Sequence, residues 1–192
     1  MAVIGVVLAA GKGRRFAAAA PDTPFKLLAL IDGEPMVRRT VLSLLDGGAD
    51  RCVVVVSGDT ETAVASALNG LPVTLTVNPK PARGMFSSIQ CGVAHLRADD
   101  QGVLLPGDMP YVRPETIAAV LSAAIRADVS ACASYANRRG HPLVISTALR
   151  DRILQAPTDA KLNEVRSLEE CLSVDVPDPG VHHDVDRPED IG

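Results

Sequence analysis

The stretch VIGVVLAAGKGRRF, residues 3–16, decides the fold class expected for this chain. Its apolar, largely β-branched run from Val3 to Ala9 predicts a buried strand. Gly11 and Gly13 follow this run, and two arginines come directly after them. A glycine turn after a strand lets backbone amides approach an anion closely, so the pattern is typical of a phosphate-binding loop. A basic tight turn that binds nothing is the open alternative.

Two common phosphate loops do not fit this stretch. A dinucleotide-binding fingerprint that starts at Gly11 needs glycine at position 16, where the chain has Phe16. A P-loop needs Gly-x4-Gly-Lys followed by Ser or Thr, and the sequence has no such string. We therefore expect a different phosphate loop, in which Arg15 and the later Lys26 bind a triphosphate and offset charge during transfer.

Strands and helices alternate along the chain. This order predicts an α/β fold with a mostly parallel sheet and helices on both faces. Ligands of such sheets bind beyond the carboxyl ends of the strands. The expected strands are residues 3–9, 26–33, 51–59, 73–79, 102–108, 129–135 and 141–146, with a short one near 173–176. The expected helices begin at Pro35, Thr60, Met85 and Pro114, with one or two more in the tail and a terminal one at Pro188.

Composition limits the classes of partner. A length of 192 residues with 47% hydrophobic residues predicts a single domain, residues 1–192, with a real core. Only 3% of residues are aromatic and the net charge is −4, which disfavours a nucleic-acid partner. The first apolar run is too short for a membrane span, and the four cysteines are scattered without zinc spacing. We expect a cytoplasmic protein with no membrane partner.

Carboxylates at two places could bind a metal ion. Asp108 follows a buried strand, where a functional group is expected, and one or two carboxylates are typical for Mg²⁺. A turn aspartate that caps the next helix is the alternative. Asp184 and Asp186 lie two residues apart, so on a strand they would face the same side, and either could be a second ligand.

Two further motifs suggest contacts with substrates. A strand ends at Asn78, and Ser87 and Ser88 stand in the first turn of the next helix, where amides and hydroxyls can bind an anion or a base. Ordinary N-capping by serine is equally compatible. His141 precedes an apolar strand and could face an acceptor, although a lone histidine there is more often structural.

Six motifs in order are similar to those of the molybdenum cofactor nucleotidyltransferases: LAAGKGRRF, KLLALIDGEPMV, NP…GMFSSIQCG, LPGDMP, RRGHPLVIS and DVDRPED. They span nearly the whole chain. The cytidylyl branch resembles it most, because Ala9-Ala10-Gly11 stands where the guanylyl branch prefers Ala-Gly-Gly. The resemblance implies a Rossmann-like three-layer α/β/α sheet and Mg²⁺-dependent transfer of CMP from CTP to molybdopterin, with pyrophosphate released. A molybdenum enzyme that receives the product is a further implied partner.

The resemblance also implies roles for individual residues. Lys26, Arg15 and Asp108 would be catalytic, Asp108 and Asp186 would hold the metal, and His141 would lie on the acceptor side. Nucleotide binding would fall to Leu8, Ala9, Ala10, Gly11, Gly13, Lys26, Asn78, Gly84, Ser87 and Ser88.

One departure concerns the acceptor. Cytidylyl members often carry a Gly-Asp-x-Gly-Ala-Arg-like turn after the Gly-His-Pro strand, and here only Asp159 fits it. Another phosphorylated acceptor, or a non-catalytic carrier of a nucleotide or the finished cofactor, are the alternatives. An NAD-linked oxidoreductase is disfavoured because its glycine fingerprint is missing.

Overall fold

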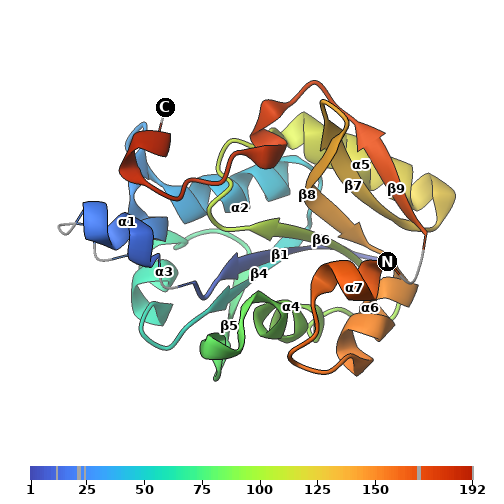
Figure 1. Ribbon diagram of the computed structural model, residues 1–192, viewed down its shortest axis with the longest axis horizontal. Coiled ribbons are helices and arrows are strands. Elements are labelled where there is room, and N and C mark those ends of the chain that lie inside the picture. Colours follow the sequence, from blue (N-terminus) through green and yellow to red (C-terminus); the bar gives the residue numbers. More distant parts are fainter. Residues whose placement is uncertain (12, 21–22, 24, 168–169, 192) are drawn as a thin grey trace.

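Seven strands form one sheet through the middle of the protein, in the order β5-β4-β1-β6-β8-β7-β9 (Figure 1). The computed structural model describes residues 1–11, 13–20, 23, 25–167 and 170–191. All neighbours in the sheet are parallel except at β8, which is antiparallel to both β6 and β7. The strands are β1 Val3–Ala9, β4 Arg51–Val56, β5 Val73–Val77, β6 Gln101–Pro106, β7 Ser130–Tyr135, β8 Arg138–Ile145 and β9 Cys171–Asp175.

Helices cover both faces of this sheet, which confirms the expected α/β/α layering. Helices α2, α3 and α5 share one buried cluster with the sheet, and α4, α6 and α7 share the cluster on the opposite face. Within the described ranges, no helix combines the length and apolarity that a membrane crossing requires. The helices are α1 Arg14–Ala19, α2 Met36–Asp46, α3 Glu61–Ala67, α4 Met85–Val93, α5 Pro114–Ala127, α6 Thr147–Gln155 and α7 Leu162–Arg166.

The central strands are apolar along nearly their whole length because both of their faces are covered. In β4, Val53 to Val56 are fully buried, and Val103 to Leu105 of β6 are buried to the same degree. Helix α4 lies especially close to the sheet at Gly92, where a Cβ atom would overlap the Val6 side chain and stand 3.0 Å from Val55. This close packing holds the last turn of α4 against β1 and β4.

The expected strand over residues 26–33 is wrong in its first half. Lys26–Leu28 is a 3₁₀ turn, and only β2, Leu30–Ile31, is extended; it pairs with β3, Glu34–Pro35. The reason is a tight turn at Asp32 and Gly33, both with positive φ, which closes a separate two-stranded hairpin. The segment therefore stays outside the main sheet and is free to turn Lys26 inward.

Strand β8 begins three residues earlier than its apolar pattern indicates. Ala136 and Asn137 both have positive φ, 51° and 60°, and make a two-residue hairpin turn between β7 and β8. The register between the two strands then shifts, since Cys132 on β7 pairs with Leu143 on β8 while Ser134 pairs with Arg139. Two positions along β7 therefore correspond to four positions along β8. The extra β8 residues form a bulge that contains His141. The hairpin and bulge thus present β8 residues at the edge where the parallel strands end.

Candidate active site

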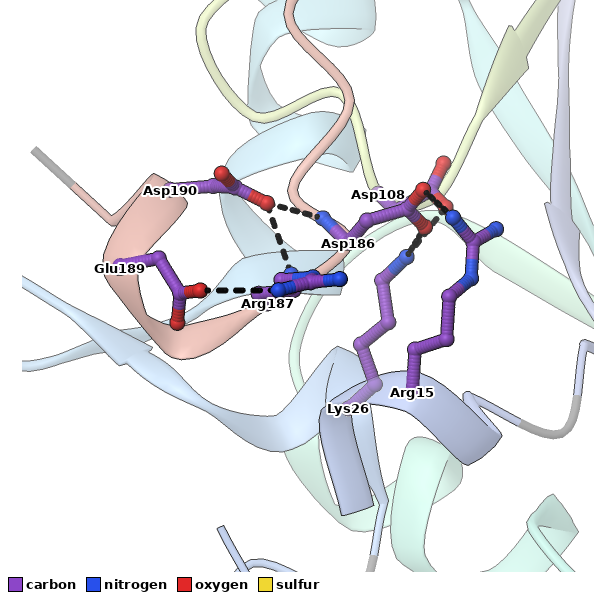
Figure 2. Close-up of polar contacts among 7 residues, drawn as sticks. All are labelled: Arg15, Lys26, Asp108, Asp186, Arg187, Glu189 and Asp190. Atoms are coloured by element: carbon purple, nitrogen blue, oxygen red, sulfur yellow. Dashed lines mark hydrogen bonds and ion pairs between the residues drawn. The ribbon is translucent and has the colours of Figure 1, made fainter. Parts of the chain in front are cut away.

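A buried lysine joins two carboxylates at the carboxyl edge of the sheet (Figure 2). The Lys26 ammonium lies 2.8 Å from Asp108 Oδ2 and 3.0 Å from Asp186 Oδ1, and the lysine is only 9% exposed. Arg15 adds a second cation, 2.6 Å from Asp186 Oδ2. Three of the residues predicted as catalytic or metal-binding therefore meet directly, and the fourth contacts the same network.

The glycine loop after β1 brings Lys26 to this point. Gly13 is the N-cap of α1 and has a φ of 53°, a left-handed conformation that favours glycine. A Cβ atom on Gly13 would lie 2.7 Å from the Lys26 Cβ, so the two backbones pack directly against each other. Arg15 follows on α1, and its exposed guanidinium group reaches the Asp186 carboxylate (Figure 2).

Asp108 is positioned by the end of β6. The Gly107 amide donates to the Leu8 carbonyl at 2.9 Å, and the Thr40 hydroxyl donates to the Gly107 carbonyl at 3.1 Å. A side chain on Gly107 would stand 2.9 Å from that Leu8 oxygen, so only glycine allows the strand ends to approach this closely. The turn therefore directs Asp108 across the end of β1 toward the glycine loop.

Asp186 comes from an irregular segment, so the same-side geometry that a strand would give Asp184 and Asp186 does not apply. The Val185 amide donates to the Asp108 carbonyl at 2.9 Å, which ties this segment to β6. The amides of Asp186 and Arg187 both donate to Asp190 Oδ2, at 2.9 and 2.7 Å (Figure 2). These hydrogen bonds lower the pKa of Asp190, because they stabilise its charged form.

Glycine also allows the path of this segment over the sheet. A Cβ atom on Gly140 in β8 would overlap the Val181 carbonyl and stand 2.9 Å from the His182 ring. One on Gly180 would overlap the Tyr111 carbonyl. The segment that contains Gly180 can therefore pass directly over β8. This path brings Asp186 back to Asp108.

Two of three adjoining cavities are lined by one or both acids of the pair, and the third opens beside them. A small one of about 60 Å³ is lined by Leu8, Gly11, Gly13, Lys26, Leu27 and Asp108. A second, of about 420 Å³, contains both acids together with Arg15 and His141. The side chains of Ala9 and Ala10 are 1% and 6% exposed, so these two residues can offer a ligand their backbone only.

The predicted nucleotide contacts on α4 form a network of their own. The Asn78 amide group donates to the hydroxyls of Ser87 and Ser88, each at 2.9 Å. Ser87 in turn donates to the Gly84 carbonyl at 2.8 Å. All three polar side chains are buried, so the network shapes the first turn of α4. Gly84, with a φ of 98°, is exposed at the start of that turn.

His141 lies in the wall between the second cavity and a third, larger one. Burial lowers the pKa of this histidine to about 4, although the Leu104 backbone acts in the opposite direction. The ring is therefore neutral near pH 7. Its Nδ1 atom is buried and has no hydrogen-bond partner among the described residues.

The acid pair fits a metal ion that arrives with other ligands. Within the described part of the chain, no three His, Cys, Asp or Glu side chains gather into a metal site. One oxygen each of Asp108 and Asp186 lies within 3.0 Å of the same lysine nitrogen, so one cation can contact both. Mg²⁺ commonly takes one or two carboxylates and completes its shell with phosphate oxygens and water. The donor set therefore suits Mg²⁺ bound together with a phosphate.

Several site residues are not apparent from the sequence reading. The position of Asp190 in the first turn after Pro188 could have marked it as a capping residue. That it accepts from the amides of Asp186 and Arg187 depends on the folded path of the segment. Arg139 and Arg166 line the third cavity; Arg139 stands in the RRGHPLVIS motif, whereas no local motif marks Arg166.

The chain is similar to several known proteins. The family described as "MobA-like NTP transferase domain" matches residues 5–174. The chain is 38% identical over 122 residues to the bifunctional protein GlmU of Alkalilimnicola ehrlichii, covering 62% of this chain and 24% of that protein. It is 30% identical over 158 residues to nicotine blue oxidoreductase of Paenarthrobacter nicotinovorans, covering 79% and 74%. A probable molybdenum cofactor guanylyltransferase of Natronomonas pharaonis is 33% identical over 113 residues, covering 59% and 52%.

The fold is also found among solved structures. A nucleotidyl transferase from Methanothermobacter thermautotroptrophicus superposes with a TM-score of 0.81 at 24% identity, over 98% of this chain and 94% of that one. The chain spans about a quarter of the length of the GlmU proteins that it matches.

Proposed function

Because the chain belongs to the MobA-like NTP transferase family, we propose that it is a Mg²⁺-dependent cytidylyltransferase. In this proposal it transfers CMP from CTP to the phosphate of molybdopterin, and it releases pyrophosphate. The observation that carries the proposal is the contact of Lys26 with both Asp108 and Asp186 beside the glycine loop. A cationic cradle beside two carboxylates is what a triphosphate and its divalent cation require together.

The reaction needs no covalent intermediate on the protein. An oxygen of the acceptor phosphate attacks the α-phosphorus of CTP, and the bond between the α-phosphorus and the bridging oxygen breaks. Pyrophosphate leaves with that electron pair, and its growing charge is offset by Lys26 and Arg15. Because a phosphate monoester is already largely ionised near neutral pH, the attack requires no dedicated general base. Positioning and charge stabilisation therefore provide the catalysis.

Asp108 and Asp186 would hold Mg²⁺, which supplies charge neutralisation at the phosphates when bound. In the structure Lys26 and Arg15 form ion pairs with these two acids. Binding of the metal with the nucleotide would release both cations toward the triphosphate. The loop from Leu8 to Gly13 would contact the triphosphate through its backbone, since the Ala9 and Ala10 side chains are buried.

The identity of the nucleotide base and the identity of the acceptor are the most specific parts of the proposal. Cytosine is supported by Ala9-Ala10-Gly11, and the guanylyltransferase among the relatives makes GTP the first alternative. Asn78, Gly84, Ser87 and Ser88 would bound the base site from α4, and His141 would face the acceptor. GlmU among the relatives makes another phosphorylated acceptor the second alternative. The reaction would take place in the cytoplasm, and a molybdenum enzyme would receive the product.

The test is a pyrophosphate assay with Mg²⁺, purified molybdopterin and each of the four nucleoside triphosphates. Wild-type protein should release pyrophosphate rapidly with CTP. Asp108→Asn should lower the rate about 1,000-fold or more, because one of the two metal-binding carboxylates is lost. Asp99→Asn is the matched control, since Asp99 is an exposed carboxylate that contacts only the amino terminus among the described ion pairs.

Each outcome of this assay has a distinct meaning. Full turnover by Asp108→Asn would overturn the assignment of the site. Rapid release with GTP would replace the cytidylyl proposal by a guanylyl one. Release only with another phosphorylated acceptor would replace molybdopterin. Nucleotide binding without pyrophosphate release under any condition would favour a non-catalytic carrier.

A further inference from the structure

The largest of the three cavities, about 640 Å³, lies between the first turn of α4, the bulge of β8 and α7. It shares Met85, Arg139, Gly140 and His141 with the cavity that contains the acid pair. A molecule whose phosphate stands beside Asp108 and Asp186 can therefore extend into it without crossing the protein. The cavity at the glycine loop shares Asp108 with the acid-pair cavity and shares no lining residue with this largest one.

Cations dominate the polar lining of this cavity. Arg83, Arg139, Lys161 and Arg166 face it, against one carboxylate, Asp159. Lys161 pairs with Glu164 at 3.8 Å, and among the described ion pairs none involves any of the three arginines.

The three guanidinium groups contact neutral oxygens instead. Arg139 donates to the Cys171 carbonyl at 3.3 Å, and Arg166 donates to the Asn163 side chain at 3.2 Å. Arg83 lies 3.5 Å from the Thr158 hydroxyl. Each of the three guanidinium groups therefore still has N–H donors available for an anionic ligand. Guanidinium N–H groups bind carboxylate or phosphate oxygens well.

The rest of the wall is apolar. Phe86, Ile89 and Leu143 are buried behind it, while Met85 projects from the start of α4 with 59% of its surface exposed. An exposed methionine at a cavity mouth can pack against flat ligands of different shapes. A purely polar body, such as a sugar ring, would leave this surface poorly matched.

We infer that this cavity binds the body of the acceptor, and that the acceptor has an apolar or planar body and a second anionic group besides its reacting phosphate. This inference rests on the proposed function for the place of the reacting phosphate. The second anionic group would be bound by Arg139 and Arg166, with Arg83 at the rim. The inference thus favours a heteroaromatic phosphate with an additional anionic group over a simple sugar phosphate.

The first experiment tests the cavity without any turnover. Anilinonaphthalene sulfonate, an aromatic body with one anionic group, is titrated into the full-length protein and its fluorescence is followed. Wild-type protein should bind it, and Arg139→Gln/Arg166→Gln should bind it about tenfold more weakly, because two charge-assisted contacts are lost. Arg152→Gln on α6, which lies outside the cavity lining, is the matched control and should bind like wild type.

The second experiment uses pyrophosphate release with molybdopterin and CTP. In the double variant the KM for molybdopterin should rise about tenfold, and the KM for CTP should stay within about twofold. Single Arg139→Gln and Arg166→Gln variants, each checked by its melting curve, keep the test valid if the double variant unfolds.

The two experiments separate the two proposals. Equal binding of the sulfonate by wild type and by both single variants would overturn the inference about the cavity. A rise in the KM for CTP alone would overturn it as well, since the nucleotide would then occupy the cavity. Sulfonate binding that depends on the arginines, without any pyrophosphate release from molybdopterin, would leave the cavity assignment standing and remove the proposed function.

Discussion

The Lys26 ammonium stands 3.0 Å from Asp186, although 160 positions separate the two residues in the chain. The same nitrogen lies 2.8 Å from Asp108. A single buried cation therefore lies between the two carboxylates, where the proposed function puts a divalent metal. Lys26 thus offsets the charge of the acid pair, and in the proposed function a metal ion that binds alone would compete with this internal cation.

That competition predicts an unusual effect of removing the lysine. Lys26→Met should bind Mn²⁺ about tenfold more tightly than wild type in the absence of nucleotide, because a repelling charge is lost. Binding of CTP with Mg²⁺ should weaken by about the same factor, since the cradle loses its cation. Electron paramagnetic resonance of free Mn²⁺ measures the first effect, and calorimetry measures the second. Lys80→Met, on an exposed loop, is the control, and unchanged Mn²⁺ affinity in Lys26→Met would contradict the prediction.

The glycine loop offers a matched pair of substitutions. Gly13→Ala should destabilise the protein by about 1–2 kcal/mol or more, because an alanine is strained at a φ of 53° and its Cβ would press on Lys26. Gly11→Ala should change stability by about 0.5 kcal/mol or less, since the described surroundings of Gly11 leave room for a Cβ. Urea unfolding monitored by circular dichroism measures both. Equal stabilities for the two variants would show that the loop does not require its left-handed residue.

Asp190 and Glu189 provide a test of how Asp186 is held. Asp190→Ala removes the acceptor for the amides of Asp186 and Arg187, so exchange of these two amide hydrogens should quicken about tenfold or more. Glu189→Ala is the control, because Glu189 contacts only the Arg187 side chain among the described polar contacts. Hydrogen exchange followed by NMR gives both rates. Unchanged protection in Asp190→Ala would mean that other contacts hold the segment.

His141 predicts a pH dependence of stability. Its folded-state pKa of about 4 lies below the ordinary value of 6.5, so the unfolded chain binds the proton first as the pH falls. Stability should therefore be lost between pH 6.5 and pH 4, by up to about 2 kcal/mol at pH 5, and this loss should end below pH 4. Urea unfolding at pH 7 and pH 5 measures it. His141→Asn should reduce this loss of stability, whereas His95→Asn on the surface should leave it unchanged. If His141→Asn loses as much stability as the wild type does, other groups are responsible for the pH dependence.

The architecture follows from local patterns that agree with one another. The valine run of β4 and the leucines of β6 can be buried on both faces only inside a parallel sheet with helices on each side, and the structure has that arrangement. That Lys26, Asp108 and Asp186 belong to one site could also be anticipated, because each residue stands beside a recognisable motif. Their direct pairing with one another could not be, since it depends on where three distant segments cross.

The errors have physical causes as well. The run from Lys26 to Ile31 has strand-like composition, but the turn at Asp32 and Gly33 closes a small hairpin instead. The bulge of β8 and the turn at Ala136 carry no strong sequence signal, because alanine rarely adopts positive φ. Arg139 and Arg166 come from separate elements, so the cavity that they line becomes visible only after the sheet and α7 are assembled.

The path of the segment over β8 has a consequence for biosynthesis. During translation the glycine loop, Lys26 and Asp108 leave the ribosome long before Asp186, and the seven-stranded sheet can already be complete at Asp175. A nascent or clipped chain that stops there would have its cradle but only one of the two carboxylates. In the proposed function such a chain would be folded but inactive, because the segment that leaves the ribosome last supplies the second metal-binding carboxylate.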